Sequence, residues 1–425
     1  MSPTSGRGVQ LARLSAGLLD AGLASLGTFL VGAYATIYLT PAELGAFAVF
    51  QSALFLAAVL PAQGILLPAE AAALSLPDGH RLAWLGSTIR SGLPLALIAS
   101  TSVLIAAALT PDTVGSEAVL ALALTAAAGI ILSPLQDHVR RMMHLAKVSH
   151  RAALISGTYV VSALAALIVL HALDVPAPWI PLGALTVANA ISMFVGVTLS
   201  RNRSTPPGSL SDRSPRLSEL WQSGRWLVFA GGISPLASFV TVLLITGIAG
   251  AEAMGNAEAA RVVAQPIFVF GVGMASVVGP RSMEAGRERS QSRARELRRK
   301  FTWVNVAFTV PYVAVFGWDS PLNPLTEFFA TAYVINGLVA LQVAGNLIWM
   351  LTRPMQAELV GARAERRLTV AQAIGNSVQP VIALSSAFLG AVAKPLSDLV
   401  SGVAAFVAQR IELAKIYRSD TSSDR

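Results

Sequence analysis

Long apolar runs separated by short polar stretches dominate the pattern of this sequence. About twelve runs of roughly 18 to 26 residues carry few charges, and a helix of that length crosses a hydrocarbon core of about 30 Å. The predicted spans are residues 14–39, 42–67, 83–109, 117–135, 154–173, 179–199, 227–249, 257–279, 301–318, 328–351, 368–389 and 395–416. The first run is too long for a signal peptide and lacks a small-residue cleavage site, so we expect a retained helix. The pattern predicts an all-α polytopic membrane protein with about 12 transmembrane helices.

The second half of the chain repeats the first. SLGTFL at 25–30 corresponds to PLASFV at 235–240, and an offset of about 210 residues also pairs Gly45 with Gly255. Two like halves within a membrane protein are common in transporters, where each half forms one lobe. We therefore expect two pseudo-symmetric six-helix lobes.

Positive charge is concentrated in alternate loops. The loops on one side contain Arg81, Arg140, Arg141, Lys147, Arg151, Arg201, Arg203, Arg213, Arg216, the eight cations from Arg281 to Lys300, Arg353, Arg363, Arg366 and Arg367. The loops on the other side are short and contain one cation, Lys394. Short loops rich in Lys and Arg remain in the cytoplasm, so both termini are predicted to be cytoplasmic.

This orientation defines the expected domains. Because each half has six spans, the halves share one orientation and are related by an axis along the membrane normal. We expect an N-terminal lobe over residues 1–199, a polar cytoplasmic linker over residues 200–222 and a C-terminal lobe over residues 223–425.

Composition excludes several classes of function. The chain is 54% hydrophobic and 13% charged, which is too apolar for a soluble domain. It has no cysteine, its five histidines are scattered, and it contains no phosphate-cradling loop of the Gly-x-x-x-x-Gly-Lys-Ser/Thr type. The short outer loops leave little room for membrane glycosyltransferase chemistry. We expect no catalytic residues, no metal, no cofactor and, since the loop cations account for the net charge of +8, no nucleic-acid partner.

The segment 25–50, SLGTFLVGAYATIYLTPAELGAFAVF, carries a recognisable motif. Its Leu39, Pro41, Glu43 and Gly45 form a Leu-x-Pro-x-Glu-x-Gly turn between the first two spans. This opening resembles that of the polysaccharide exporters in the multidrug/oligosaccharidyl-lipid/polysaccharide (MOP) superfamily, the branch that includes O-antigen flippases. Two Pro-x-Gln segments, at Pro134 and Pro354, resemble that family's joins between spans four and five and between spans ten and eleven.

The resemblance implies a fold and a function. It implies a V-shaped pair of six-helix lobes, similar to those of MATE transporters, around a central cavity. The protein would move a lipid-linked oligosaccharide or related polysaccharide precursor across the bacterial inner (plasma) membrane by alternating access. Its partners would be the lipid bilayer and the lipid-linked glycan substrate, with polysaccharide assembly enzymes as further candidates.

Arg261 is the first candidate for substrate binding. A charge at the bilayer centre costs about 2.5 to 3.5 kcal/mol on insertion scales, so such residues mark functional sites. In flippases that this chain resembles, basic residues of the eighth span face the cavity, where Arg261 would bind a phosphate through two hydrogen bonds. The alternative is an ion pair with Glu258, three residues earlier on the same helical face.

Asp20 and Arg90 are charged candidates in the first half. Asp20 either carries a proton that couples transport or pairs with a cation such as Arg13 or Arg90. Related MATE antiporters place their cation-binding acid deeper, near Thr28, and this sequence departs from that pattern. Arg90 faces a cavity if the third span begins near residue 83, and is an ordinary flank if that span begins later.

Amide side chains complete the candidate cavity. Within predicted spans they suit either sugar hydroxyls or interhelical hydrogen bonds of about 0.6 kcal/mol each. The candidates are Gln51, Gln265, Gln342, Asn346 and Asn376.

Two other functions remain open. One is a proton- or sodium-coupled antiporter of small molecules, similar to MATE proteins, which an anionic cavity would favour. The other is a non-transporting membrane scaffold for envelope assembly, which sealed apolar packing between the lobes would favour.

Overall fold

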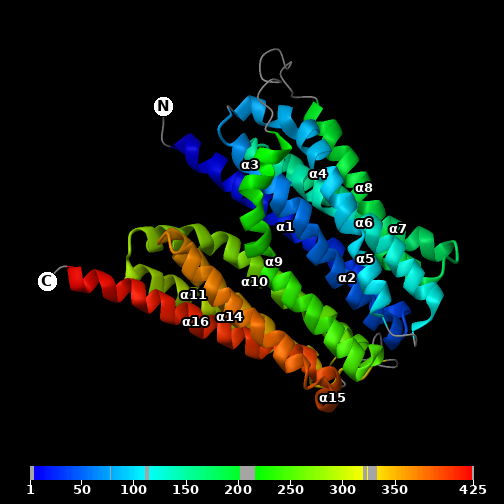
Figure 1. Cartoon of the computed structure of the whole chain (residues 1–425). Helices are drawn as coiled ribbons and strands as arrows, with labels where there is room; N and C mark the ends of the chain where they lie inside the picture. Colours follow the sequence, from blue (N-terminus) through cyan, green and yellow to red (C-terminus); the bar gives the residue numbers. More distant parts are fainter. Residues whose placement is uncertain are drawn as a thin grey trace. The chain divides into compact units, whose positions relative to one another are not determined.

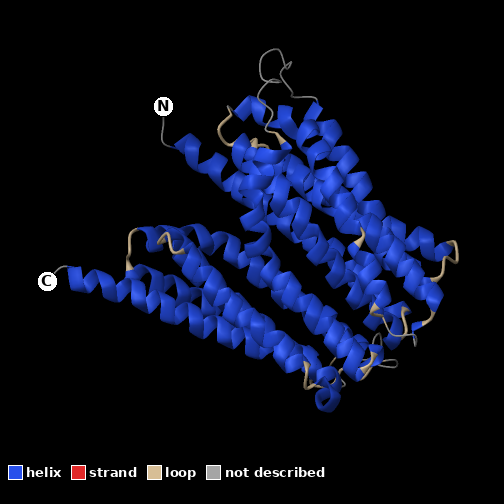
Figure 2. Ribbon diagram, in the orientation of Figure 1, coloured by secondary structure: helices blue, strands red, loops and turns tan. Residues whose placement is uncertain are grey.

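The computed structural model describes residues 4–76, 78–110, 114–201, 216–318, 323 and 333–423, and within these ranges the secondary structure is helical, with no strand (Figure 2). Among the described residues, nine helices are long and apolar enough to cross a membrane. The all-helical membrane fold is therefore confirmed. The count of about twelve spans and the cytoplasmic location of both termini stay predictions.

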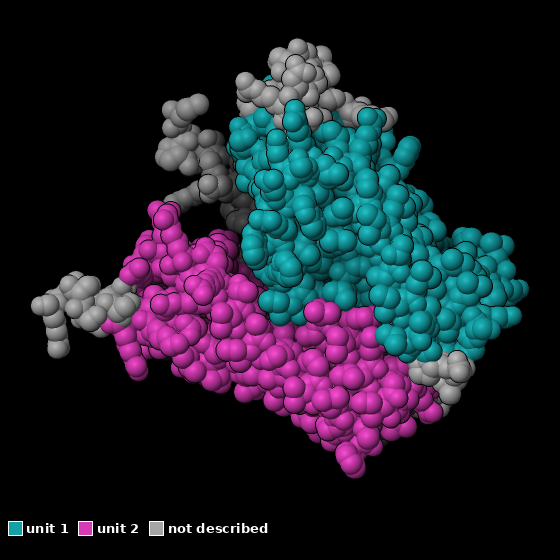
Figure 3. All heavy atoms as spheres, in the orientation of Figure 1, with its two compact units in different colours: residues 1–38, 49–235 teal, residues 39–48, 236–425 magenta. Residues whose placement is uncertain are grey.

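The chain forms two compact units (Figure 3). Unit 1 comprises Met1–Tyr38 and Val49–Pro235, and unit 2 comprises Leu39–Ala48 and Leu236–Arg425. The chain therefore passes from one unit to the other within two helices, α2 and α9, as well as between α1 and α2. The division into residues 1–199, 200–222 and 223–425 stays a prediction, and most of its linker lies outside the described residues.

The helices of unit 1 follow the predicted spans in order (Figure 1). They are α1 (Thr4–Tyr38), the second part of α2 (Pro41–Pro61), α3 (Leu67–Ala73), α4 (Leu85–Ser100), α5 (Ser102–Ala108), α6 (Ser116–Leu145), α7 (Ser149–Ala172), α8 (Ile180–Arg201) and the first part of α9 (Leu217–Ala249). A π-helical turn, Ala62–Leu66, joins α2 to α3 between Pro61 and Pro68, each of which lacks an N–H donor. The helix therefore continues from α2 through the π-helical turn into α3, and Glu70 lies at the far end of the second predicted span.

Unit 2 contains the remaining long helices. They are the second part of α9, α10 (Ala251–Arg287), α11 (Gln291–Phe316), α13 (Leu338–Gly361), α14 (Glu365–Ala383), the short α15 (Ser386–Leu389) and α16 (Ala393–Ser423). Helices α11, α13 and α14 lie at the predicted ninth, tenth and eleventh spans, yet they are not among the nine helices that are long and apolar enough to cross a membrane. Polar and charged side chains interrupt their apolar runs, as Asn346 does in α13.

Glycines allow helices to cross closely within unit 2. A Cβ on Gly45 would lie 1.9 Å from the carbonyl oxygen of Ala251, and a Cβ on Gly255 would lie 1.8 Å from that of Pro41. The contacts are reciprocal between the first turns of α2 and α10, and small residues permit such approaches in membranes. The two glycines that the sequence repeat pairs are therefore partners in one crossing.

Short turns hold consecutive helices side by side. Four turns between helices contain a non-glycine residue in the left-handed region, namely Lys147, Asp174, Arg289 and Arg363. At the first of them, the N–H of Val148 donates to the carbonyl of Met143 over 3.0 Å and closes the end of α6. The turn brings the end of α6 next to the start of α7, where His144 and Ser156 reach the same carboxylate.

Candidate functional site

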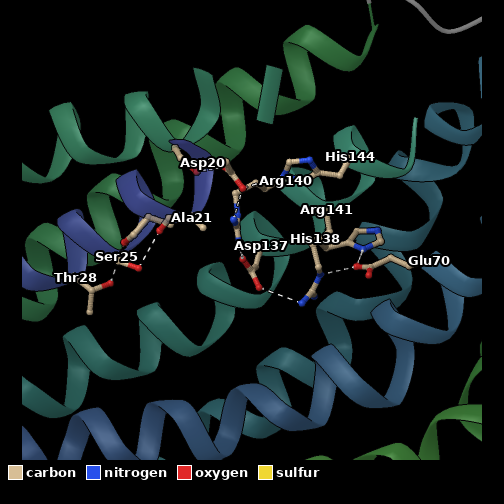
Figure 4. A network of polar contacts seen from close by, with 12 residues as sticks. Asp20, Ala21, Ser25, Thr28, Glu70, Asp137, His138, Arg140, Arg141 and His144 are labelled. Atoms are coloured by element: carbon tan, nitrogen blue, oxygen red, sulfur yellow. Dashed lines mark hydrogen bonds and ion pairs between the residues drawn. The ribbon is translucent and has the colours of Figure 1, made fainter. Parts of the chain in front are cut away.

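A buried carboxylate on α1 is the centre of a polar network in unit 1 (Figure 4). Asp20 accepts hydrogen bonds from the Ser156 hydroxyl at 2.6 Å, from Arg140 Nη1 at 2.6 Å and from His144 Nε2 at 2.9 Å. These contacts join α1 to α6 and α7. They also surround the Asp20 carboxylate with three donors, so its charge is compensated inside the protein.

A second carboxylate of the network lies on α3. Glu70 Oε1 is 2.8 Å from His138 Nδ1 and accepts a hydrogen bond from Arg141 Nε at 3.0 Å. The other ring nitrogen of His138 is 2.8 Å from the Thr88 hydroxyl on α4. This order of hydroxyl, imidazole and carboxylate is also found in hydrolases, but Thr88 is buried and lies within hydrogen-bonding distance of the carbonyls of Trp84 and Leu85 at the start of α4. The contacts therefore tether α3, α4 and α6.

Asp137 joins these two parts. Its carboxylate is 2.6 Å from Arg140 Nη2 and 3.2 Å from Arg141 Nη1. We call the connected set the unit 1 network: Asp20, Glu70, Thr88, Asp137, His138, Arg140, Arg141, His144 and Ser156. It contains three carboxylates, two guanidiniums and two imidazoles, and it lies near the helix ends predicted to face the cytoplasm.

In unit 2, an ion pair lies on α10. Glu258 is buried and accepts two hydrogen bonds from Arg261, from Nε to Oε2 at 2.7 Å and from Nη2 to Oε1 at 2.5 Å. The Arg261 side chain is 29% exposed, whereas that of Glu258 is 3% exposed. The buried Glu258 carboxylate thus holds one edge of the Arg261 guanidinium, and part of the Arg261 side chain lies on the protein surface. Arg261 also interacts electrostatically with Asp398 on α16.

Asp398 belongs to a second ion pair nearby. Its two carboxylate oxygens each lie 2.6 Å from Lys394 Nζ, and its Oδ2 accepts a hydrogen bond from Gln342 Nε2 on α13 at 3.0 Å. Asn346, one turn further along α13, accepts from Gln342 at 3.3 Å and donates to the carbonyl of Ala264 on α10 at 3.2 Å. We call this set the unit 2 cluster: Glu258, Arg261, Gln342, Asn346, Lys394 and Asp398.

Several solved structures share this architecture. No protein-family model matches the chain, and no curated protein matches it in sequence. The chain is similar to an inward-facing multidrug resistance MATE family transporter of the MOP superfamily, with 13% identity, 93% of this chain and 96% of that chain covered, and a TM-score of 0.66. It is also similar to the lipid II flippase MurJ in an inward closed conformation, with 10% identity, coverage of 93% and 87%, and a TM-score of 0.67. The chain has the MOP fold.

A third relative with the MOP fold comes from Pyrococcus furiosus. This MOP superfamily transporter shares 15% identity, with 95% of each chain covered and a TM-score of 0.59, and its binding pocket is described as having reverse polarity. The expected fold family is therefore confirmed at the level of the MOP fold. The polysaccharide-exporter branch and the substrate stay predictions, because MATE transporters and a flippase match alike.

Unit 2 brings three of the sequence-based candidates together. Arg261, Gln342 and Asn346 lie in the unit 2 cluster, and the alternative partner of Arg261, Glu258, contacts it there. The Arg261 side chain remains partly exposed beside Glu258, and its role in binding stays a prediction.

Asp20 and Arg90 lie apart from that cluster. One interpretation of the sequence paired Asp20 with a cation such as Arg13 or Arg90. In the structure, the Asp20 carboxylate instead contacts Arg140 and His144. Arg90 is exposed on α4 and forms no ion pair with a residue that the structure describes. The side chain of Arg13 lies outside the described residues.

The remaining amide candidates are dispersed. Gln51 is buried on α2, and Gln265 lies on α10 with its buried Oε1 lacking a hydrogen-bond partner among the described atoms. Asn376, buried on α14, donates to the carbonyl of Gln372 at 2.8 Å, and its Oδ1 has no described partner. Their assignment to a substrate cavity stays a prediction.

Sequence reasoning missed the residues that complete both sites. The apolar pattern places Lys394 in a loop, although its spacing of four residues from Asp398 is the spacing of an ion pair on one helical face. His138 and Glu70 are 68 residues apart, so no local pattern could have paired them.

In the described part of the chain, no group of three or more His, Cys, Asp or Glu could hold a metal ion.

Proposed function

We propose that this chain is a membrane translocase that moves a lipid-linked oligosaccharide or related polysaccharide precursor by alternating access, in the bacterial inner membrane. The MOP fold supports this proposal, since both a lipid II flippase and multidrug transporters share it. The choice of a phosphorylated glycolipid rests on the chemistry of the unit 2 cluster.

The proposed substrate class rests on Arg261. It is a cation within a membrane-length helix, and Glu258 holds it from one edge through two hydrogen bonds while 29% of its side chain stays exposed. A guanidinium fixed in this way loses little freedom when it binds an anion, and its planar donors match phosphate oxygens. Asn346, an amide of the same cluster that is only partly buried, is suited to sugar hydroxyls.

The unit 1 network favours a flippase over a cation-coupled antiporter. An antiporter of this fold would need an acid that exchanges a proton or a sodium ion during transport. Asp20 is the acid in α1, but Ser156, Arg140 and His144 already surround its carboxylate. Asp20 would lose the compensating charge of Arg140 only if helices α1 and α6 separated.

Reconstitution tests the function directly. We would place the full chain in liposomes with a fluorescent polyprenyl-pyrophosphate oligosaccharide and measure how much of the lipid crosses the bilayer. Translocation is expected for the protein as it stands. Arg261→Gln combined with Glu258→Gln removes the cation without leaving a buried carboxylate unpaired, and we expect it to slow translocation about tenfold or more. Arg366→Gln, an exposed arginine of α14, is the matched control.

Three results would count against the proposal. If lipid does not cross while a proton or sodium gradient drives dye uptake, and Asp20→Asn abolishes that uptake, the chain is an antiporter. If neither substrate moves in folded protein, the scaffold function replaces it. If the double variant translocates as fast as Arg366→Gln, Arg261 does not bind the phosphate.

A further inference from the structure

A buried lysine lies in the first turn of helix α16. Lys394 is 5% exposed, and its ammonium lies 2.6 Å from each oxygen of Asp398, one helical turn later. Lysine is almost never buried unless it is paired, because its charge loses hydration. The ammonium therefore depends on the Asp398 carboxylate, and the carboxylate depends on it.

The other neighbours of this carboxylate are neutral amides. Gln342, 2% exposed, donates from Nε2 to Asp398 Oδ2 at 3.0 Å and to Asn346 Oδ1 at 3.3 Å. Its own Oε1 is buried and has no hydrogen-bond partner among the described atoms. Carboxylate and amide oxygens are the ligands that hard cations such as sodium take in proteins. Lys394 thus lies in a setting that resembles a cation site.

The charge of the cluster matches one monovalent cation. Glu258 and Arg261 compensate each other through two hydrogen bonds. The two carboxylates of the cluster, Glu258 and Asp398, are thus balanced by two cations, Arg261 and Lys394, and the Lys394 ammonium lies 2.6 Å from Asp398. Without the ammonium the cluster would hold one uncompensated carboxylate, and a divalent ion would overcompensate it.

We infer that Lys394 is a built-in cation, whose ammonium occupies a carboxylate and amide site on α13 and α16 that would otherwise bind a monovalent metal ion. Because the ammonium is covalently attached, this site neither takes up nor releases an ion. For the proposed translocase, on which this consequence rests, unit 2 then requires no coupling ion at Asp398.

Thermal unfolding of the purified full chain tests the inference without a transport substrate. We would compare sodium chloride with N-methyl-D-glucamine chloride at equal ionic strength, and we expect no difference for the unchanged protein. Lys394→Met empties the site, so its Tm should be lower in N-methyl-D-glucamine and rise by about 3 °C or more as sodium binds. Lys394→Gln keeps a donor to Asp398 and is expected to respond in the same way, which covers failure of Lys394→Met to fold.

Matched variants identify the site. Lys394→Arg keeps the positive charge and should show no sodium response, and Lys394→Gln with Asp398→Asn should lose it. Lys415→Met, an exposed lysine of α16 paired with Glu412, should behave like the unchanged protein. A sodium response in the unchanged protein that Asp398→Asn abolishes, or no response in folded Lys394→Gln, would overturn the inference. Either result leaves the lipid translocation assay to be judged separately.

Discussion

The unit 1 network and the unit 2 cluster occupy two halves that share a repeat, yet their charges do not repeat. At an offset of 210 residues, Ala230 takes the place of Asp20, and Gln51 takes the place of Arg261. The close crossing of Gly45 and Gly255, in contrast, uses equivalent positions of both halves. Helix packing is therefore the feature that the halves have in common, and buried charge is the feature in which they differ.

The two sites also differ in how many partners each carboxylate has. In the unit 1 network, Asp20 has three donors, and Glu70 and Asp137 have two each, many of them distant in sequence. In the unit 2 cluster, the ion pairs of Glu258 and Asp398 are formed with cations three or four residues away on the same helix. Redundant long-range contacts fix helices to one another, whereas single local pairs place charge on one helix.

Removing Arg261 should have the largest effect on stability. In Arg261→Met, the buried Glu258 loses its cation, and breaking a buried pair on one side costs about 3 to 5 kcal/mol. Adding Glu258→Gln removes the unpaired charge and should recover most of that loss. Chemical unfolding of both variants in detergent measures the difference. Equal stability of the single and the double variant would show that Glu258 has other compensation.

Removing Arg140 should have a smaller effect, although Arg140 contacts two carboxylates. In Arg140→Met, Asp20 keeps His144 and Ser156, and Asp137 keeps Arg141. We expect a loss of about 1.5 to 3 kcal/mol, the range for hydrogen bonds to charged groups. The same unfolding experiment measures it.

The redundancy itself can be tested at Asp20. Combining Arg140→Met with His144→Gln should lower the free energy of unfolding by more than the sum of the two single changes. In each single variant the remaining residue still contacts Asp20, whereas the double variant loses both contacts. Strict additivity would mean that the partners of Asp20 act independently, and the distinction between the two sites would fail.

The sequence could predict what is periodic and what repeats. Apolar runs predict the helices, and the repeat pairs Gly45 with Gly255, which lie in the same crossing of α2 and α10. It could not predict that His138 lies between Glu70 and Thr88, because those residues come from three helices and nothing local marks their contact. Arg261 and Glu258 were within reach of sequence reasoning since their spacing puts them on one helical face.

Removing an exposed ion pair on α11 should have the smallest effect on stability, and this effect is the reference for the buried ion pairs. Lys300 Nζ lies 2.6 Å from Glu296 Oε1, and both side chains are more than half exposed. The hydrogen bond from Lys300 lowers the pKa of Glu296 below its usual value. The pair therefore contributes stability above the usual pKa of a glutamate, and this contribution disappears as the pH falls through the lowered pKa.

Lys300→Met should accordingly change Tm by no more than about 1 °C near neutral pH, because water and salt screen exposed pairs. The difference should vanish in acid, where Glu296 is protonated, and also in concentrated salt. Thermal unfolding at two pH values and two salt concentrations measures it. If Lys300→Met instead lowers Tm as much as Arg140→Met, then burial does not separate the network of unit 1 from surface ion pairs, and the stability assigned to Asp20 and its partners would need another source.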